Sequence, residues 1–465
     1  MPTFVFPFPA HPDLLVSGLR DQRRALEWVN KYITDFGGDP SNVTIFGSGS
    51  GAADIISHLY SNLNKSDPLF ARAIVQSAIV ENNVPNVPTA GWLLSRALSA
   101  HGVSTLDQLR DIRAETLADI RCPLRAVDDG FFFRPGWRDS LFPPVETENN
   151  DGLVRHSLAA HRLGVHKGNR ESRSPHPQGR MAPPPTISGL QPFIIGDCAC
   201  DSDLWSTQVS GWVASGVVRR LRAICQSLNK ATALLNAYDI TPHTTYELTD
   251  RISELVEDAR IAWPTECVVQ AARRSGRSVW RYVFDQEGPA RGVPHHASDL
   301  IYLFDNVPLP LSPATSPMSF ENDEPLPSLP SSESSIGDFT EMIISRARTL
   351  DDIEQMDEDG FDYSSPARPR GGWPQPVVDE WSYGRVRDAI QSRWIAFAWG
   401  ERPWDNSRGK IFVFGPEGES GERSAGVFEG RRRRKIWEEV LRPLGAALVH
   451  KVGVELSNGP ADGPR

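Results

Sequence analysis

The stretch Val43-Thr44-Ile45-Phe46-Gly47-Ser48-Gly49-Ser50-Gly51 decides the fold predicted for this chain. Its first four residues are apolar or β-branched, which is typical of a short buried parallel strand. A glycine-dense turn follows at once, and a helical pattern resumes from Ala52 to Tyr60. Upstream, 18–36 has a helical pattern that ends at Gly37-Gly38-Asp39-Pro40. The sequence therefore predicts a helix, a strand, a tight turn and a second helix in this order.

The alternation of strands and helices continues through most of the chain. We predict further strands at 71–76, 192–196, 279–284 and 410–414, and helices at 92–109, 217–259 and 377–399, with a basic helix from Arg431. Such alternation favours an α/β fold with a doubly wound, mostly parallel sheet flanked by helices.

Two segments interrupt this pattern and define the predicted domain organisation. Residues 1–304 and 377–465 are expected to form one α/β domain, to which 377–465 contributes C-terminal helices and a closing strand. Residues 305–376 are rich in proline and serine and then acidic, so they cannot bury enough apolar surface to offset the ordering of the chain. We therefore predict a disordered insertion there, and a second, low-complexity insertion near 165–187.

Composition excludes several classes of protein. The formal net charge is −10, and no concentrated basic face indicates nucleic-acid binding. No run of about 18 apolar residues predicts a membrane span, and prolines interrupt the first 19 residues, which argues against a signal peptide. A cytoplasmic location is the default expectation.

Cysteines and basic residues provide no clear ligand set. Five cysteines include the C-x-C of Cys198 and Cys200, which fits neither zinc spacing nor a redox C-x-x-C. We therefore expect no metal and no cofactor. The run 431–435 (Arg-Arg-Arg-Arg-Lys) is interpreted as the solvated start of a helix, with a nuclear-localisation or anionic-surface patch as the alternative.

Several segments, in order along the chain, resemble the carboxylesterase type B (cholinesterase-like) family. Strand, tight turn and helix at 43–60 have the arrangement of a nucleophile elbow. The other matching segments are 18–22, 25–29, 36–40, 68–77, 195–197, 280–285, 296–300, 394–398 and 403–404. The resemblance implies an α/β-hydrolase fold and a serine carboxylic-ester hydrolase as the parent activity.

The same resemblance places glycine where the nucleophile is expected. The family's Phe-Gly-Glu-Ser-Ala-Gly elbow aligns with 46–51, so that Gly49 occupies the nucleophile position and the catalytic serine is lost. Ser50 is the alternative nucleophile, although a slip of one residue would redirect its side chain. The resemblance also implies that the N-terminal strands and the upstream oxyanion loop are missing, so that this chain is an N-terminally truncated member.

The acid and the base are better preserved. In the family that the chain resembles, the acid lies five residues after the glycine of a strand-end loop. Counted from Gly196, the resemblance implies Asp201 as the acid, where the family more often has glutamate. For the base, counting back from Phe304 favours His296, whereas counting forward from Gly292 favours His295; we prefer His296.

These observations predict a catalytically impaired esterase scaffold or pseudoenzyme. The alternatives are a residual ester hydrolase that uses Ser50 with His296 and Asp201, and an incomplete gene product. The expected partner is a small-molecule ester if the chain is active, and a protein partner is possible if it is a binding scaffold.

Overall fold

The computed structural model describes most of the predicted α/β domain. It covers residues 17–103 apart from 63 and 65–67, residues 105–143 apart from 114 and 116–125, residues 190–307 apart from 290, and residues 378–460. The predicted insertion near 165–187 lies outside the described residues, as does all of the one at 305–376 except its first three positions. No helix among the described residues is both long and apolar enough to cross a membrane.

The described residues contain a six-stranded sheet with the strand order β1-β2-β3-β4-β5-β6. Strands β1 to β5 are parallel, and β6 is antiparallel to β5. The strands are β1 (Thr44–Ser48), β2 (Arg72–Gln76), β3 (Phe193–Cys198), β4 (Val279–Phe284), β5 (Ile411–Phe414) and β6 (Ser420–Arg423). This arrangement confirms the predicted α/β fold with a mostly parallel sheet.

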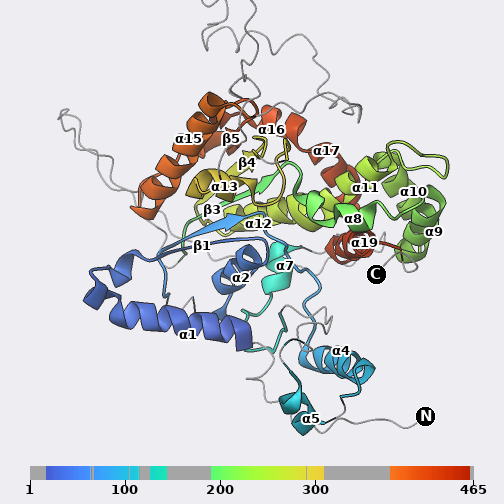
Figure 1. The fold of residues 1–465 in the computed structure, drawn as a ribbon, viewed down its shortest axis with the longest axis horizontal. Helices are drawn as coiled ribbons and strands as arrows, with labels where there is room; N and C mark the ends of the chain where they lie inside the picture. The colour runs from blue at the N-terminus through green and yellow to red at the C-terminus, as the bar shows by residue number, and fades with distance from the viewer. Residues whose placement is uncertain are drawn as a thin grey trace, which may run out of the picture.

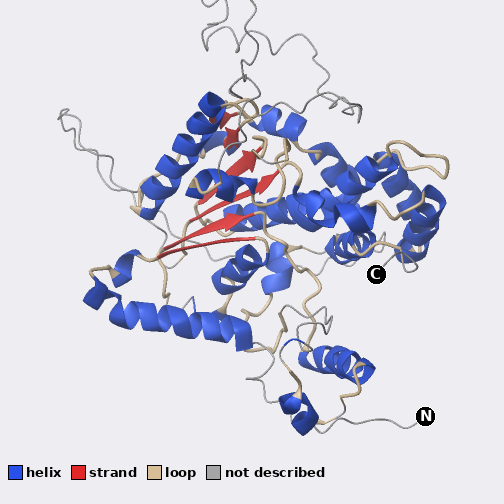
Figure 2. Cartoon of the chain, in the orientation of Figure 1, coloured by secondary structure: helices blue, strands red, loops and turns tan. Residues whose placement is uncertain are grey.

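Helices surround the sheet (Figures 1 and 2). The α-helices are α1 (Ser17–Tyr32), α2 (Ser50–Leu59), α4 (Val87–Ala100), α5 (Leu106–Asp111), α7 (Trp137–Leu141), α8 (Ser206–Val209), α9 (Ala214–Cys225), α10 (Leu228–Ala237), α11 (Leu248–Glu257), α12 (Trp263–Arg274), α13 (Ser298–Phe304), α15 (Glu380–Ala398), α16 (Ala425–Arg431), α17 (Arg434–Ile436), α18 (Arg442–Leu444) and α19 (Ala446–Ser457). Short 3-10 helices occupy Ile33–Phe36, Pro40–Asn42, Asp201–Trp205 and Ser407–Gly409, and single π-helical turns occupy Asp258–Ala262 and Trp437–Leu441.

The two faces of the sheet pack against different helices. On one face, Phe193, Ile195 and Val279 belong to a core that also contains apolar side chains of α2 and α12. On the other face, Ile194 and Trp280 pack with α13 and α15. Successive residues of a strand point to opposite faces, so this two-residue alternation is expected of strands that are buried on both sides. The sheet is the middle layer of three.

A further core lies beyond the sheet, among α9, α10, α11 and α19. Val283 of β4 and Val413 of β5 connect it to the sheet. Helix α11 ends at Glu257 inside this region, close to the segment that follows β3. This packing fixes the position of Glu257 relative to the edge of the sheet.

The predicted single helical stretch over 217–259 is wrong in detail, because it contains three separate helices. Helix α9 ends where Gln226 adopts φ +51°, in the left-handed region. The side chain of Ser227 then accepts a hydrogen bond from the N–H of Lys230 and begins α10. The sequence signal of this break is Ser227, because serine is a common N-cap residue and so indicates the start of a new helix.

Strand β6 is absent from the sequence prediction. Its residues, Ser420-Gly421-Glu422-Arg423, lack the β-branched and aromatic side chains that indicate a strand. It forms because the chain turns back after β5 through 415–418 and pairs with β5 as an antiparallel edge strand.

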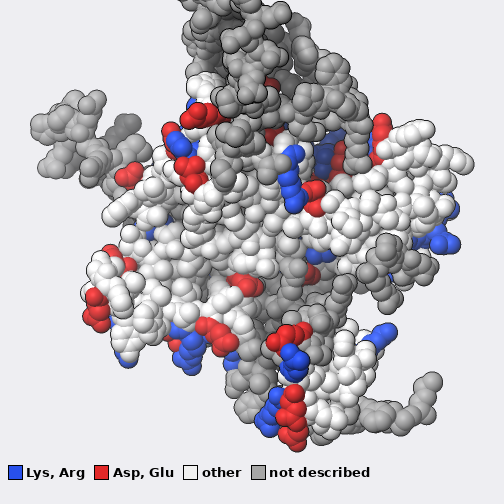
Figure 3. All heavy atoms as spheres, in the orientation of Figure 1, with Lys and Arg blue, Asp and Glu red and all other residues white. Residues whose placement is uncertain are grey.

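Acidic and basic side chains of the described residues are interspersed on the face shown in Figure 3. Small groups of Lys or Arg lie next to groups of Asp or Glu. Surface ion pairs such as Arg24–Glu27 and Arg442–Glu438 agree with this distribution.

Candidate functional site

Three parallel strands end at one edge of the sheet and bring the candidate residues to it. Gly49 directly follows β1, Asp201 lies just after β3, and His296 lies in the loop after β4. Residues far apart in the sequence meet there because the carboxyl ends of parallel strands lie along the same edge.

The turn at Gly49 has the strand–turn–helix geometry of a nucleophile elbow. Gly49 has φ +59° and ψ −116°, and it separates the last residue of β1 from the first residue of α2. Its N–H donates to the carbonyl of Gln76 over 3.0 Å, and its carbonyl accepts the N–H of Ile79 over 3.2 Å. Hydrogen bonds on both sides hold the sharp turn in place.

Gly47 and Gly51 flank the turn and differ in the space around them. A Cβ on Gly47 would lie 2.9 Å from the carbonyl carbon of Gly51, whereas a Cβ on Gly51 would have nothing within 4 Å. We expect Gly47→Ala to lower the free energy of unfolding by about 2 kcal/mol, because backbone must shift to relieve the clash. Gly51→Ala, in the first turn of α2, is expected to be neutral or slightly stabilising. Urea unfolding of both variants measures the difference, and equal losses would contradict the elbow geometry.

Asp201 and His296 form a hydrogen-bonded pair that faces Gly49. His296 Nδ1 lies 2.7 Å from Asp201 Oδ1, and Asp201 Oδ2 accepts the backbone N–H of Cys198 over 2.9 Å. The carboxylate of Asp201 is fully buried, and 15% of the His296 side chain is exposed. A Cβ on Gly49 would lie 3.0 Å from His296 Nε2. Acid, base and nucleophile position therefore stand in the relative order of a hydrolase triad, but position 49 has no side-chain oxygen.

His295, the alternative base, is directed elsewhere. Its Nδ1 lies 2.8 Å from the carbonyl oxygen of His296. Its Nε2 lies against Gly288, only 2.7 Å from where a Cβ on that glycine would stand. The structure thus places His296 beside Gly49 and His295 against the 288 loop.

The pKa of His296 is predicted to respond to Asp201. Burial lowers this pKa, but the hydrogen bond and the charge of Asp201, with a smaller effect of Asp299, raise it above its ordinary value. The protonated pair therefore adds stability at acid pH, which is lost as the pH rises through the folded-state pKa. We expect Asp201→Asn to move the pKa of His296 below its ordinary value, since burial then dominates. Following the imidazole signals by NMR, with His296→Gln for assignment, measures both values; an unchanged pKa in Asp201→Asn would refute the coupling.

A second carboxyl group near Asp201, Glu257, was not identified from the sequence. Its Oε2 accepts the N–H of Ser202 over 2.6 Å, and Oε1 has no hydrogen-bond partner among the described residues. Burial, followed by the charge of Asp201, raises the pKa of Glu257 well above its ordinary value. Burial and the neighbouring carboxylate therefore favour the neutral form of Glu257. Its position at the end of α11, without any motif, gave no sequence signal.

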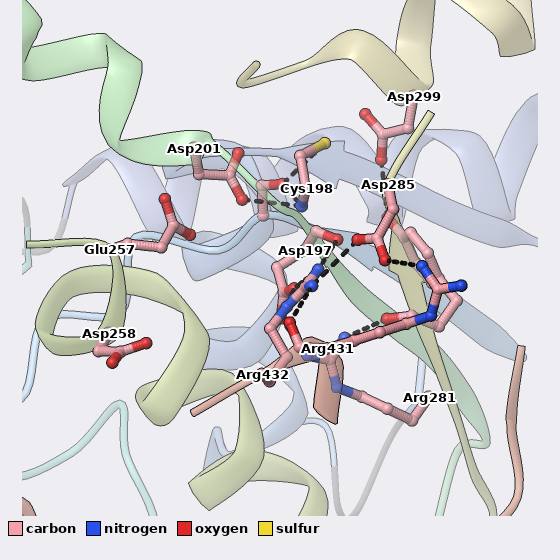
Figure 4. Close-up of polar contacts among 12 residues, drawn as sticks. Asp197, Cys198, Asp201, Glu257, Asp258, Arg281, Asp285, Asp299, Arg431 and Arg432 are labelled. Atoms are coloured by element: carbon pink, nitrogen blue, oxygen red, sulfur yellow. Dashed lines mark hydrogen bonds and ion pairs between the residues drawn. The ribbon is translucent and has the colours of Figure 1, made fainter. Parts of the chain in front are cut away.

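The prediction that the arginine run is the solvated start of a helix is wrong for its first part: α17 begins at Arg434, but Arg432 is buried and Arg431 and Arg433 are only partly exposed. Arg432 is 6% exposed and donates from Nε to Asp197 over 2.8 Å and from Nη1 to Asp285 over 3.0 Å. Arg431 also pairs with Asp285, over 2.7 Å. Arg281, fully buried, is a second partner of Asp197. Figure 4 shows these arginines gathered around the two aspartates, below the ends of β3 and β4.

Ser50, the alternative nucleophile, begins α2 and is exposed. It lines a cavity of about 380 Å³ together with side chains that include Asp54, Ser57 and Trp137. Neither Gly49 nor His296 is among the residues that line this cavity. Ser50 as a nucleophile that acts with His296 stays a prediction.

The described part of the chain contains no cluster of three or more His, Cys, Asp or Glu side chains with the arrangement of a metal site. Cys198, Cys200, Cys225 and Cys267 are free thiols. Burial is the main cause that raises the pKa of Cys200 and of Cys267 to about 12, so these two thiols are protonated near neutral pH.

The chain is similar to known esterases in sequence and in structure. The carboxylesterase family model matches residues 17–125. Lipase 3 of Yarrowia lipolytica is 31% identical over 131 residues, which are 27% of this chain and 26% of the lipase. Carboxylesterase patB of Penicillium expansum is 36% identical over 119 residues, which are 26% of this chain and 21% of that enzyme. The aligned segment thus spans only about a quarter of these relatives.

The structural similarity extends over more of the chain. A solved pNB esterase structure matches with a TM-score of 0.52 and 18% identity, over 90% of this chain and 67% of the esterase. At this identity the structural match shows the fold alone, and the sequence similarity to the carboxylesterase family extends over residues 17–125. The chain therefore has an α/β-hydrolase fold and is similar to the carboxylesterase family in this segment.

Proposed function

We propose that this chain is a carboxylesterase-family scaffold in which serine-dependent ester hydrolysis is lost or strongly impaired. The observation that carries the proposal is the position of Gly49, whose missing Cβ would lie 3.0 Å from His296 Nε2. Ester hydrolysis through an acyl-enzyme requires an oxygen or sulfur nucleophile at this point, next to the base. Glycine supplies none, although Asp201 and His296 remain paired.

A binding role for a small ester is compatible with this arrangement. The cavity of about 380 Å³ has buried apolar walls that include Val80, Val84 and Leu141. Its volume falls in the range of small-molecule sites. Ser50, one residue after the nucleophile position, is one of the residues that line it. We infer that the scaffold retains the capacity to hold a small ester beside an elbow that does not attack it.

A fluorophosphonate probe and a short-chain p-nitrophenyl ester test the proposal on the full chain. We expect no covalent phosphonate adduct on any serine, and no ester turnover that depends on a serine. Ser50→Ala should leave both results unchanged, because Ser50 stands one residue beyond the nucleophile position of the elbow. A phosphonate adduct on Ser50, together with turnover abolished by Ser50→Ala, would overturn the proposal in favour of a residual hydrolase that uses Ser50.

A further inference from the structure

One nitrogen of His296 is engaged, and the other faces an open side-chain position. Nδ1 lies 2.7 Å from Asp201 Oδ1, so the proton belongs on Nδ1 and the lone pair on Nε2. Apart from the chain neighbours of Gly49, the atoms nearest to the position of a Cβ on Gly49 are His296 Nε2 at 3.0 Å, His296 Cε1 at 3.5 Å and Ile79 Cδ1 at 4.0 Å. The lone pair of Nε2 therefore faces the position that a side chain at residue 49 would occupy, and the Ile79 methyl group lies at the edge of that position.

An imidazole held in this tautomer is a nucleophile as well as a base. A serine at position 49 would place its hydroxymethyl group in front of Nε2 and react first. Glycine places no side-chain atom there. We propose that Nε2 of His296 is itself the acyl-accepting group of this site, and that activated esters acylate it. The inference rests on the proposed function, since it requires that no side-chain oxygen competes at position 49.

The reaction balances with the ester and water alone. The Nε2 lone pair forms a C–N bond with the acyl carbon, and the C–O bond breaks so that the leaving group departs as an aryloxide. The resulting acylimidazolium keeps its Nδ1 proton on the hydrogen bond to Asp201 or releases it to solvent. Water then attacks the acyl carbon and the C–N bond breaks, which leaves a carboxylic acid and the free imidazole of His296. One proton of the water goes to solvent if Nδ1 has kept its proton, or to the imidazole if Nδ1 has lost it.

The site favours donors whose leaving group is a weak base, such as aryl esters. The proposed step assigns no general acid to the leaving group, so the leaving group departs unaided. The cavity whose apolar walls include Val80, Val84 and Trp137, and whose polar lining includes Asp54 and Glu81, lies close by, because Val80 follows Ile79 in the chain. Its buried walls suit an aryl group.

Incubation with p-nitrophenyl acetate, followed by acid quenching and peptide mass spectrometry, tests the inference on the full chain. We expect one acetyl group, located on His296. His296→Gln should remove this adduct and slow p-nitrophenolate release by about tenfold or more, as loss of a positioned catalytic imidazole generally does. Asp201→Asn should slow release as well, because the proton then distributes between both ring nitrogens. His243→Gln, which changes an exposed histidine, is the matched control and should leave the adduct and the rate unchanged.

A second variant keeps the test decisive if His296→Gln fails to fold. Gly49→Ser should transfer the acetyl group from His296 to the side chain introduced at position 49. Absence of any acetyl group on His296 in the unmodified chain would overturn the inference and leave the proposed function intact. An acetyl group on Ser50 that Ser50→Ala removes would instead overturn the proposed function, so the two failures are distinguishable.

Discussion

Gly49→Ser is expected to give the chain a reactive serine. The elbow directs the side chain of position 49 at His296, because even a Cβ there lies 3.0 Å from Nε2. The imidazole must therefore move by a few tenths of an ångström to accept the new hydroxyl as a hydrogen-bond donor. Relative to Gly49→Ala, we expect turnover of p-nitrophenyl acetate to rise by about 10²-fold or more, since the nucleophile and base then act as a unit. A fluorophosphonate should label the new serine.

The gain should stop short of a complete hydrolase. A tetrahedral intermediate needs preorganised donors, each worth about 10²–10³ in rate. In the part of the chain that the structure describes, we identify one such donor, the N–H of Ser50. It lies in the first turn of α2, where backbone amides have no acceptor within the helix. The restored rate therefore measures how much of the oxyanion site this single amide supplies.

Gly49→Ala is the control for backbone strain. Both substitutions place a Cβ at φ +59°, a conformation that costs a residue with a side chain about 1–2 kcal/mol. Both variants should therefore lose similar stability in a thermal melt, while only serine adds an oxygen. Similar ester turnover by the two variants would contradict the assignment of Gly49 to the nucleophile position.

The elbow could be predicted from the sequence because its signals are local. An apolar, β-branched run, a glycine-rich turn and a renewed helical period stand next to one another, and the structure places β1, Gly49 and α2 there. The positive φ of Gly49 also explains why glycine is accommodated at this position without strain.

Sequence spacing reduced the candidates for the base to His295 and His296 but could not decide between them. His295 and His296 are neighbours, and counting from two sides gave different answers. What separates them is the path of the loop, in which Ala297 has φ +64° and the His295 ring turns to Gly288. Backbone direction at one position decides which ring reaches Gly49, and sequence spacing carries no information about it.

The buried ion pairs of Asp197 could not be predicted from the sequence for a different reason. Asp197 meets Arg281 and Arg432, which are 84 and 235 positions away in the sequence. Neither arginine carries a local signal, and a run of basic residues is ordinarily a solvated surface. Only the tertiary fold, which brings the segment after β6 against the ends of β3 and β4, shows that these charges are buried.

Asp197→Asn is expected to cause the largest loss of stability among single substitutions near the site. The Asp197 and Arg281 side chains are both fully buried, and Arg432 is nearly so. Among the described residues, Asp197 is the only carboxylate paired with Arg281, whereas Arg432 also binds Asp285. Asparagine preserves the shape and removes the charge, which leaves the guanidinium of Arg281 buried without a counter-ion. Removal of one partner from a buried ion pair costs about 3–5 kcal/mol.

Two comparisons separate this effect from a general sensitivity of the region. Asp203→Asn also neutralises an aspartate just after β3, but its partner Arg291 is 60% exposed, so we expect a loss of about 1 kcal/mol or less. Adding Arg281→Met to Asp197→Asn removes the unpaired cation, and the double variant should be more stable than Asp197→Asn alone. Chemical unfolding of all four proteins measures these differences. A double variant no more stable than Asp197→Asn would show that the loss comes from packing or hydrogen bonding at position 197 and not from the buried charge of Arg281.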